Sequence, residues 1–285
     1  MSEAKKEALK EQVDKIIKVS TIPSVVSRII AVTEDSGSNV RDLEKIIEHD
    51  QAIASRVVGL SNAVYYGFPR KITSISQAVL VLGFDMVKGL AVSTAVFDGF
   101  NGFDRALMTS LWRHSFETAK AAVLVAERSG IVNKDSAFLA GLLHDIGRPI
   151  LYQIFGKEYS KLTPDDSNSL IALEEEAFGA GHAEVGSWFA DKCKLPSSCI
   201  NSIRYHHNPE LFRSPINGNP LSVLVPIVYL ANLIVLDGQE NHGRYTEISR
   251  AQAHALQAAR INGENLIQIQ ETVAAQRDKI TEYYV

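Results

Sequence analysis

Apolar residues recur at helical spacing along almost the whole chain, and this periodicity limits the fold more than any other feature. In the first segment Leu9, Val13, Ile16 and Ile17 fall on one face of a helix. Runs of strand length in which apolar and polar residues alternate are nearly absent. The pattern therefore predicts an all-α protein.

Turn and cap residues divide this pattern into separate helices. Ser74 stands where an N-cap is expected, Gly83 is expected to end the same helix, and Pro23 suits the first turn of another. The helices that we expect cover residues 5–19, 24–34, 40–48, 51–62, 75–82, 85–97, 107–129, 136–155, 170–177, 182–192, 197–206, 221–237, 247–261 and 264–284. The Gly- and Asn-containing segment 99–104 predicts a linker between two helical lobes that meet, residues 1–100 and residues 101–285.

Composition limits where such a protein works. The apolar run at 75–97 is interrupted by charged residues, and the run at 221–236 is shorter than the ~20 residues that span a bilayer. The polar N-terminus has no signal-peptide pattern, and Cys193 and Cys199 are expected to be reduced thiols. A net charge of −4 argues against nucleic acid as a partner. We therefore expect a cytoplasmic protein with no membrane partner.

Histidines provide the first indication of chemistry. His144-Asp145 lies in a strongly apolar stretch, where adjacent side chains on a helix point about 100° apart and reach a metal only from a packed crevice. The dipeptide alone is better explained by a helix end that Gly147 closes. A second pair, His49-Asp50, has no companion histidine in the first lobe and is interpreted as a solvated turn.

Further histidines make the metal site the more specific interpretation of His144-Asp145. His114 lies on a helix with an apolar face, His182 begins a helix, and His206-His207 ends one. Each alone is explained by packing, or by a cation at a helix C-terminus. Along one lobe, however, the series reads H…HD…H…HH.

This order and spacing resemble the HD superfamily of metal-dependent phosphohydrolases. In that family the last metal ligand is an aspartate that follows an apolar run, and here the run at 225–230 leads to Ala231-Asn232. Carried over residue by residue, the resemblance implies the metal ligands His114, His144, Asp145, His182, His206, His207 and Asn232.

Asn232 weakens the site that the resemblance implies. An amide oxygen is uncharged, so Asp145 is left as the only carboxylate against one or two divalent ions. The expected cofactor is a divalent transition metal (Fe, Mn, Ni or Zn), bound weakly or not at all. Arg148 and Arg204 are candidate contacts for a phosphate group.

The first lobe narrows the resemblance to one branch. The segments IIEHDQAIASRVVGLSN at 46–62, AVYYG at 63–67 and ISQAV at 75–79 look like the HDOD (HD-related output domain) family of bacterial signalling proteins. The likeness runs over residues 22–236. It implies a helical protein, and most members are treated as regulators without demonstrated catalysis. Asn208-Pro209-Glu210 replaces the DGxGYP of the branch that hydrolyses cyclic di-GMP, which argues against that activity.

Two classes of function remain. The first, which we favour, is a non-catalytic signalling or scaffold protein that meets its protein partners in trans and whose pocket is vestigial or binds a metal, a nucleotide or a phosphate ligand. The alternative is a metal-dependent phosphohydrolase or phosphodiesterase that uses the retained histidines and aspartate. A DNA-binding role needs a local basic face that the sequence does not display.

Overall fold

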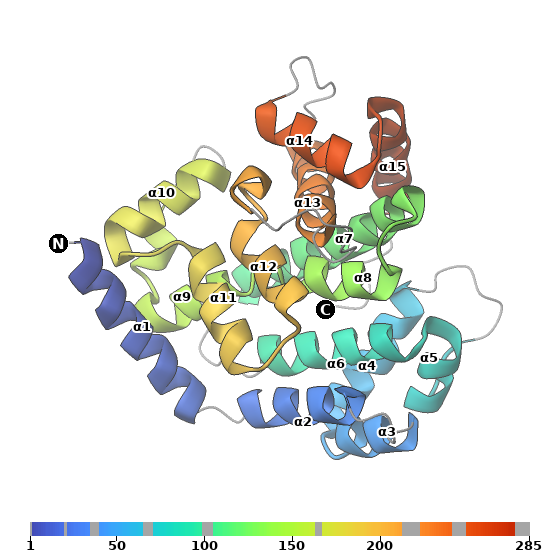
Figure 1. The fold of residues 1–285 in the computed structure, drawn as a ribbon. Coiled ribbons are helices and arrows are strands. Elements are labelled where there is room, and N and C mark those ends of the chain that lie inside the picture. The colour runs from blue at the N-terminus through green and yellow to red at the C-terminus, as the bar shows by residue number, and fades with distance from the viewer. Residues whose placement is uncertain are drawn as a thin grey trace.

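The computed structural model describes residues 2–19, 22–34, 40–64, 71–98, 105–162, 167–212, 223–240 and 249–276, and these form helices and no strand (Figure 1). The all-α prediction is therefore confirmed. The helices are α1 Ser2–Val19, α2 Ile22–Glu34, α3 Val40–Glu48, α4 Gln51–Val64, α5 Ile75–Leu82, α6 Phe84–Asp98, α7 Arg105–Ser129, α8 Lys134–Leu143, α9 Gly147–Phe155, α10 Ser167–Phe178, α11 His182–Lys192, α12 Ser197–Tyr205, α13 Leu224–Glu240, α14 Arg250–Ala259 and α15 Gly263–Gln276. Two short 3₁₀ turns, η1 Tyr159–Lys161 and η2 Pro209–Leu211, join them.

Local signals in the sequence explain several helix ends. The Ser74 side chain accepts a hydrogen bond from the backbone N–H of Gln77, and Gly83 ends α5 with φ of 91°. The Asp50 carboxylate accepts from the backbone N–H groups of Ala52 and Ile53 at the start of α4. The second His-Asp pair is therefore an exposed cap, as the sequence predicts.

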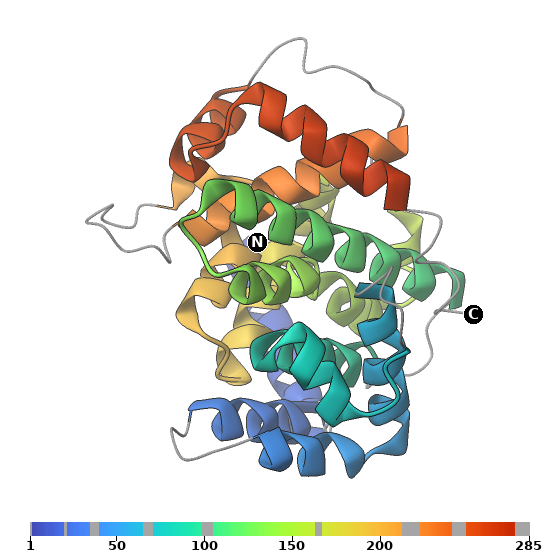
Figure 2. The ribbon, with the colours of Figure 1, turned by 90° about the vertical axis from the view of Figure 1, so that its right-hand side faces the viewer.

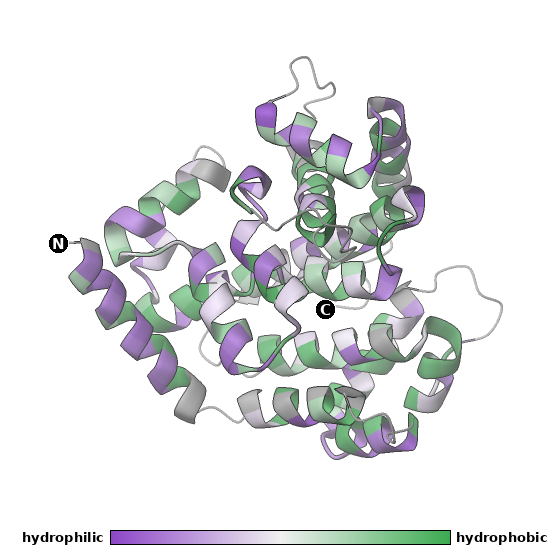
Figure 3. Cartoon of the chain, viewed as in Figure 1, coloured by the Kyte–Doolittle hydropathy of each residue, from purple (hydrophilic) through white to green (hydrophobic). Residues whose placement is uncertain are grey.

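The helices stack in layers around one hydrophobic core (Figure 2). Helix α6 lies in the middle, where it packs on α2 and α4 on one side and on α8 on the other. Gly89 of α6 lies against Phe138 and Leu139 of α8, so residues on either side of the expected linker share one buried core. Figure 3 shows the apolar residues of α6 and α13 in this interior and hydrophilic residues along α1.

Helix α1 lies along α9, α10 and α11, which belong to the second lobe. The Lys5 ammonium donates to the Glu176 carbonyl, and Lys6 pairs with Glu184 at 2.8 Å. The expected linker at 99–104 falls outside the described residues. The division into residues 1–100 and 101–285 thus stays a prediction, and both α1 and α6 pack on helices from the other side of it.

One expected helix is wrong. The sequence predicts a continuous helix over 136–155, but α8 ends at Leu143 and α9 begins at Gly147. Between them the backbone N–H of Ile146 donates to the Leu143 carbonyl, which keeps the chain hydrogen-bonded through a tighter turn. A Cβ atom at Gly147 would overlap the His182 carbonyl oxygen. The chain must therefore turn here to bring α9 and α11 into contact, a constraint that periodicity does not express.

The other expected helices lie within a few residues of the observed ones, and residues 277–284 of the last fall outside the described part. In that described part no helix is both long and apolar enough to cross a bilayer.

Candidate metal centre

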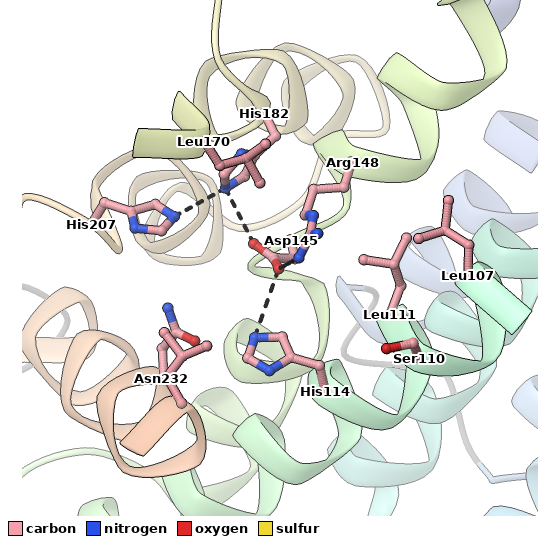
Figure 4. Close-up of a pocket in the computed structure, with 11 residues that line it drawn as sticks. Leu107, Ser110, Leu111, His114, Asp145, Arg148, Leu170, His182, His207 and Asn232 are labelled. Atoms are coloured by element: carbon pink, nitrogen blue, oxygen red, sulfur yellow. Dashed lines mark hydrogen bonds and ion pairs between the residues drawn. The ribbon is translucent and has the colours of Figure 1, made fainter. Parts of the chain in front are cut away.

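The histidines of the series form one cluster around Asp145, and Figure 4 shows His114, His182 and His207 of this cluster. The side chains come from α7 (His114), the turn between α8 and α9 (His144 and Asp145), the start of α11 (His182), the turn after α12 (His206 and His207) and α13 (Asn232). Helices α7 and α8 approach closely at Gly141, where a Cβ atom would lie 2.9 Å from the Ala119 Cα atom. This approach brings His114 next to the turn.

Asp145 is the centre of the cluster, and its side chain is only 6% exposed. Its Oδ1 atom lies 3.5 Å from Nε2 of His144 and 3.3 Å from Nε2 of both His182 and His206. Its Oδ2 atom lies 3.7 Å from Nε2 of His114. The imidazoles thus divide between the two oxygens of one carboxylate.

The potential ligand atoms form two groups that share Asp145, and within each group they lie within 4.8 Å of one another. One group is Asp145, His182, His206 and His207, and the other is His114, His144 and Asp145. Nitrogen atoms also face each other directly, with 3.0 Å between the Nε2 atoms of His182 and His207. Such an arrangement suits two neighbouring cations bridged by a carboxylate.

Backbone carbonyl groups orient two of these imidazoles. Nδ1 of His144 lies 2.7 Å from the Gly141 carbonyl oxygen, and Nδ1 of His206 lies 2.7 Å from that of Ile203. A carbonyl only accepts, so in both rings Nδ1 carries a proton and Nε2 is turned towards Asp145. This is the orientation that a metal-binding histidine requires.

Glu174 orients His182 in the same way, and the sequence analysis missed it. This buried carboxylate accepts hydrogen bonds of 2.7 Å from the backbone N–H and from Nδ1 of His182, and another from the Tyr159 hydroxyl. It is one of three consecutive glutamates, and such a charged run is typical of a solvent-exposed helix face. The available signal was its helical spacing from Leu170 and Phe178, which are both buried.

Burial and charge set the protonation of the cluster. Burial lowers the pKa of His114 to about 4 and that of His144 to about 3, so both rings are neutral at pH 7. Burial also lowers the pKa of His182, but the Glu174 and Asp145 carboxylates outweigh it and raise this pKa to about 9. Burial alone would raise the pKa of Asp145, whereas the imidazoles around it, His144 foremost, hold this pKa well below its usual range.

Two buried atoms of the cluster have no hydrogen-bond partner among the described residues, Nε2 of His206 and Oδ1 of Asn232. The Asn232 amide points into the space between His114 and His207 (Figure 4). Buried polar atoms are normally satisfied, and a cation would satisfy both of these. Imidazole nitrogens with one carboxylate and one amide oxygen form a donor set that suits a divalent transition metal, so the residues fit such an ion.

A cavity of about 200 Å³ opens on the cluster. Its polar side includes Arg148, and its rim includes Leu107, Leu111 and Leu170. Arg204 does not line this cavity, because its guanidinium pairs with Glu184 at 3.1 Å on the protein surface. Of the two arginines expected to contact phosphate, only Arg148 is placed to do so.

Comparisons with known proteins agree with this architecture. The family described as HDOD domain matches residues 19–209. An HDOD domain protein of unknown function from Geobacter sulfurreducens superposes with a TM-score of 0.73 at 24% identity, over 97% of this chain and 98% of that one. A Shewanella amazonensis SB2B protein provisionally named a phosphohydrolase superposes with a TM-score of 0.70 at 22% identity, over 96% and 98% of the two chains. At these identities the two structures show a shared fold.

A further likeness is to the sequence of a Treponema pallidum protein. An uncharacterized protein of Treponema pallidum (strain Nichols) is 28% identical over 239 residues, which cover 79% of this chain and 44% of that protein. The chain thus spans less than half the length of this relative.

Proposed function

The chain belongs to the HDOD domain family, and we propose that it is a regulatory protein of bacterial signal transduction that binds divalent transition metals at the Asp145 cluster. The observation that carries this proposal is the convergence of four imidazoles on the two oxygens of one buried carboxylate, with a fifth imidazole, His207, beside His182. In this role the metal, alone or with a phosphate-bearing ligand, changes the surface that the protein presents to partners in trans.

The charge of the site favours regulation over turnover. Asp145 is the only carboxylate in the two groups of potential ligands, and the neutral amide of Asn232 lines the same cavity. The positive charge of two divalent ions would therefore be poorly neutralised. The ion in the group formed by His114, His144 and Asp145 would be held weakly. A site that gains and loses an ion suits a sensor better than a permanently loaded enzyme.

The residues around the cluster have defined tasks in this proposal. Glu174 holds the ring of His182, and the Gly141 carbonyl holds that of His144. Arg148 faces the cavity and would bind the oxygens of a phosphate group. A bound divalent ion supplies Lewis-acid polarisation of a phosphate ester.

The second candidate function is a metal-dependent phosphohydrolase. Two observations favour it: both groups of metal-ligand atoms are complete enough to hold an ion each, and a cavity with an arginine opens on them. Both candidates need the metal, so they differ only in turnover.

Metal content and turnover together test the proposal. Protein purified without an affinity tag would be loaded in turn with Mn²⁺, Fe²⁺, Ni²⁺ and Zn²⁺, and assayed against cyclic dinucleotides and bis(p-nitrophenyl) phosphate. We expect bound metal and no turnover in the unmodified protein and in the matched control His49→Ala, and loss of the metal in His144→Ala. Turnover that disappears in His144→Ala would establish the phosphohydrolase instead. Less than about a tenth of an equivalent of metal in the unmodified protein would refute both functions.

A further inference from the structure

We propose that Arg148 and a metal ion compete for Oδ2 of Asp145, so that metal binding releases Arg148 to bind a phosphate-bearing ligand. This inference rests on the metal-binding function proposed above and adds how the site is regulated. Metal and phosphate group should then bind cooperatively, with Arg148 as the link between them.

The two oxygens of Asp145 have different surroundings. Oδ1 faces only imidazoles among the described residues, whereas Oδ2 lies 3.2 Å from the Arg148 Nη1 atom and 3.7 Å from Nε2 of His114. A metal held by His114 and Asp145 would need Oδ2, the carboxylate oxygen beside His114, as a ligand. It would then lie next to the guanidinium, and two cations so close in a buried site repel each other. Arg148 therefore takes a place beside Oδ2 that the second ion would need.

Arg148 is able to leave that place. It lies in the first turn of α9, its side chain is 26% exposed, and its ion pair with Asp145 is formed through Nη1 alone. Its buried Nε–H has no acceptor among the described residues. The guanidinium also interacts with the Tyr159 hydroxyl, and its planar fork suits two oxygens of a phosphate group once Oδ2 is released.

Once metal is bound, the cavity should favour an anionic ligand. Its polar side contains the imidazoles of His114, His182 and His207, the Asn232 amide and, as its single carboxylate, Asp145, so divalent ions would leave it with a positive charge. The volume of about 200 Å³ and the apolar rim of Leu107, Leu111 and Leu170 fit a phosphate group with a compact apolar substituent. We therefore assign a small phosphate ester as the class of ligand.

If Arg148 and the metal compete for Asp145, both the affinity for metal and the affinity for a phosphate analogue depend on the Arg148 side chain. A phosphate analogue that binds Arg148 removes the competitor from Asp145, so it should raise the affinity for metal. By reciprocity the metal raises the affinity for the analogue by the same factor. Arg148→Gln should remove both the competition and the coupling, and should therefore bind metal more tightly when no anion is present.

The experiment is calorimetric titration of Mn²⁺ into the full chain with and without methylphosphonate as the probe. Four proteins are compared: the unmodified chain, Arg148→Gln, Arg148→Lys and the matched control Arg204→Gln, whose arginine lies outside the cavity. Mn²⁺ electron paramagnetic resonance counts bound ions independently of heat. Thermal melts report which variants are folded.

We expect methylphosphonate to raise the affinity for the second Mn²⁺ about tenfold in the unmodified chain and in Arg204→Gln. Arg148→Gln should bind Mn²⁺ more tightly than the unmodified chain and show no such rise. Arg148→Lys, which keeps the charge without the planar fork, should keep the competition and lose most of the coupling.

Equal Mn²⁺ affinity and equal coupling in Arg148→Gln and the unmodified chain would overturn the inference. If Arg148→Gln does not fold, full coupling in Arg148→Lys would overturn it. Metal binding without any effect of methylphosphonate would overturn this inference alone, whereas the absence of metal binding in every form would also overturn the proposed function.

Discussion

Replacement of Glu174 by glutamine is expected to weaken both the fold and metal binding. Glu174 is completely buried, and it accepts three hydrogen bonds of 2.7 Å, of which two come from His182 and one from Tyr159. Glutamine has nearly the same volume, so the packing of α10 should persist. The change removes the charge and turns one acceptor atom into a donor.

The expected loss of stability follows from these three bonds. A hydrogen bond to a charged group contributes about 1.5–3 kcal/mol, and a glutamine oxygen can still accept some of these bonds without the charge. We expect the free energy of unfolding of the metal-free protein to fall by about 2–4 kcal/mol, or its Tm by about 5–10 °C. The affinity for metal should fall about 10- to 100-fold, because His182 loses the partner that orients it.

The pH dependence of stability provides a separate signature. Burial lowers the pKa of His182, but Glu174 and Asp145 raise it from 6.5 to about 9 in the metal-free fold. A raised pKa stabilises the fold fully below the unfolded value of 6.5, and this stabilisation is lost as pH rises through about 9. Glu174→Gln should flatten this decline, since the main cause of the raised pKa is gone.

The assay is thermal melting at several pH values, combined with calorimetric titration of Mn²⁺. Glu175→Gln is the matched control, because Glu175 is the next residue of α10 and is exposed. Equal melting temperatures and equal metal affinities for the two variants would refute the role of Glu174.

Three further predictions concern the site and the helix crossing beneath it. Asn232→Asp should raise metal affinity about tenfold, equivalent to about 1.4 kcal/mol. It should also lower the melting temperature of the metal-free protein, because a second carboxylate joins Asp145 in the pocket. An unchanged metal affinity and an unchanged melting temperature would contradict this prediction. Metal affinity should rise with pH between about 6.5 and 9, because the ion must displace the proton of His182. Calorimetric titration in buffers of different ionisation enthalpy should detect the released proton. A metal affinity that does not depend on pH would contradict this prediction. Gly147→Ala should destabilise the protein by about 3 kcal/mol in denaturant unfolding, since the added methyl group meets the His182 carbonyl. The control Gly59→Ala, with open space around it, should stabilise the protein by about 0.5–1 kcal/mol. Equal effects of the two substitutions would refute the close contact between Gly147 and His182.

The sequence by itself determined the features that depend on neighbouring residues. Helical periodicity specified the all-α class, and the caps at Ser74 and Gly83 placed both ends of α5. These signals are local because a helix hydrogen-bonds within its own segment. The order of histidines and the resemblance to the HDOD family also named the residues that the structure brings together, since chemical type is visible without coordinates.

Only the tertiary structure decided the features that depend on contacts between distant segments. The turn at 144–146 leads into a close contact between Gly147 and the backbone of His182, and no local pattern records that contact. Glu174 resembles its exposed neighbours until α10 places it against His182. Arg148 and Arg204 are equivalent in the sequence, but the fold turns one into the cavity and pairs the other with a surface carboxylate. Such distinctions arise from packing between helices, which follows from the whole chain and not from any one segment of it.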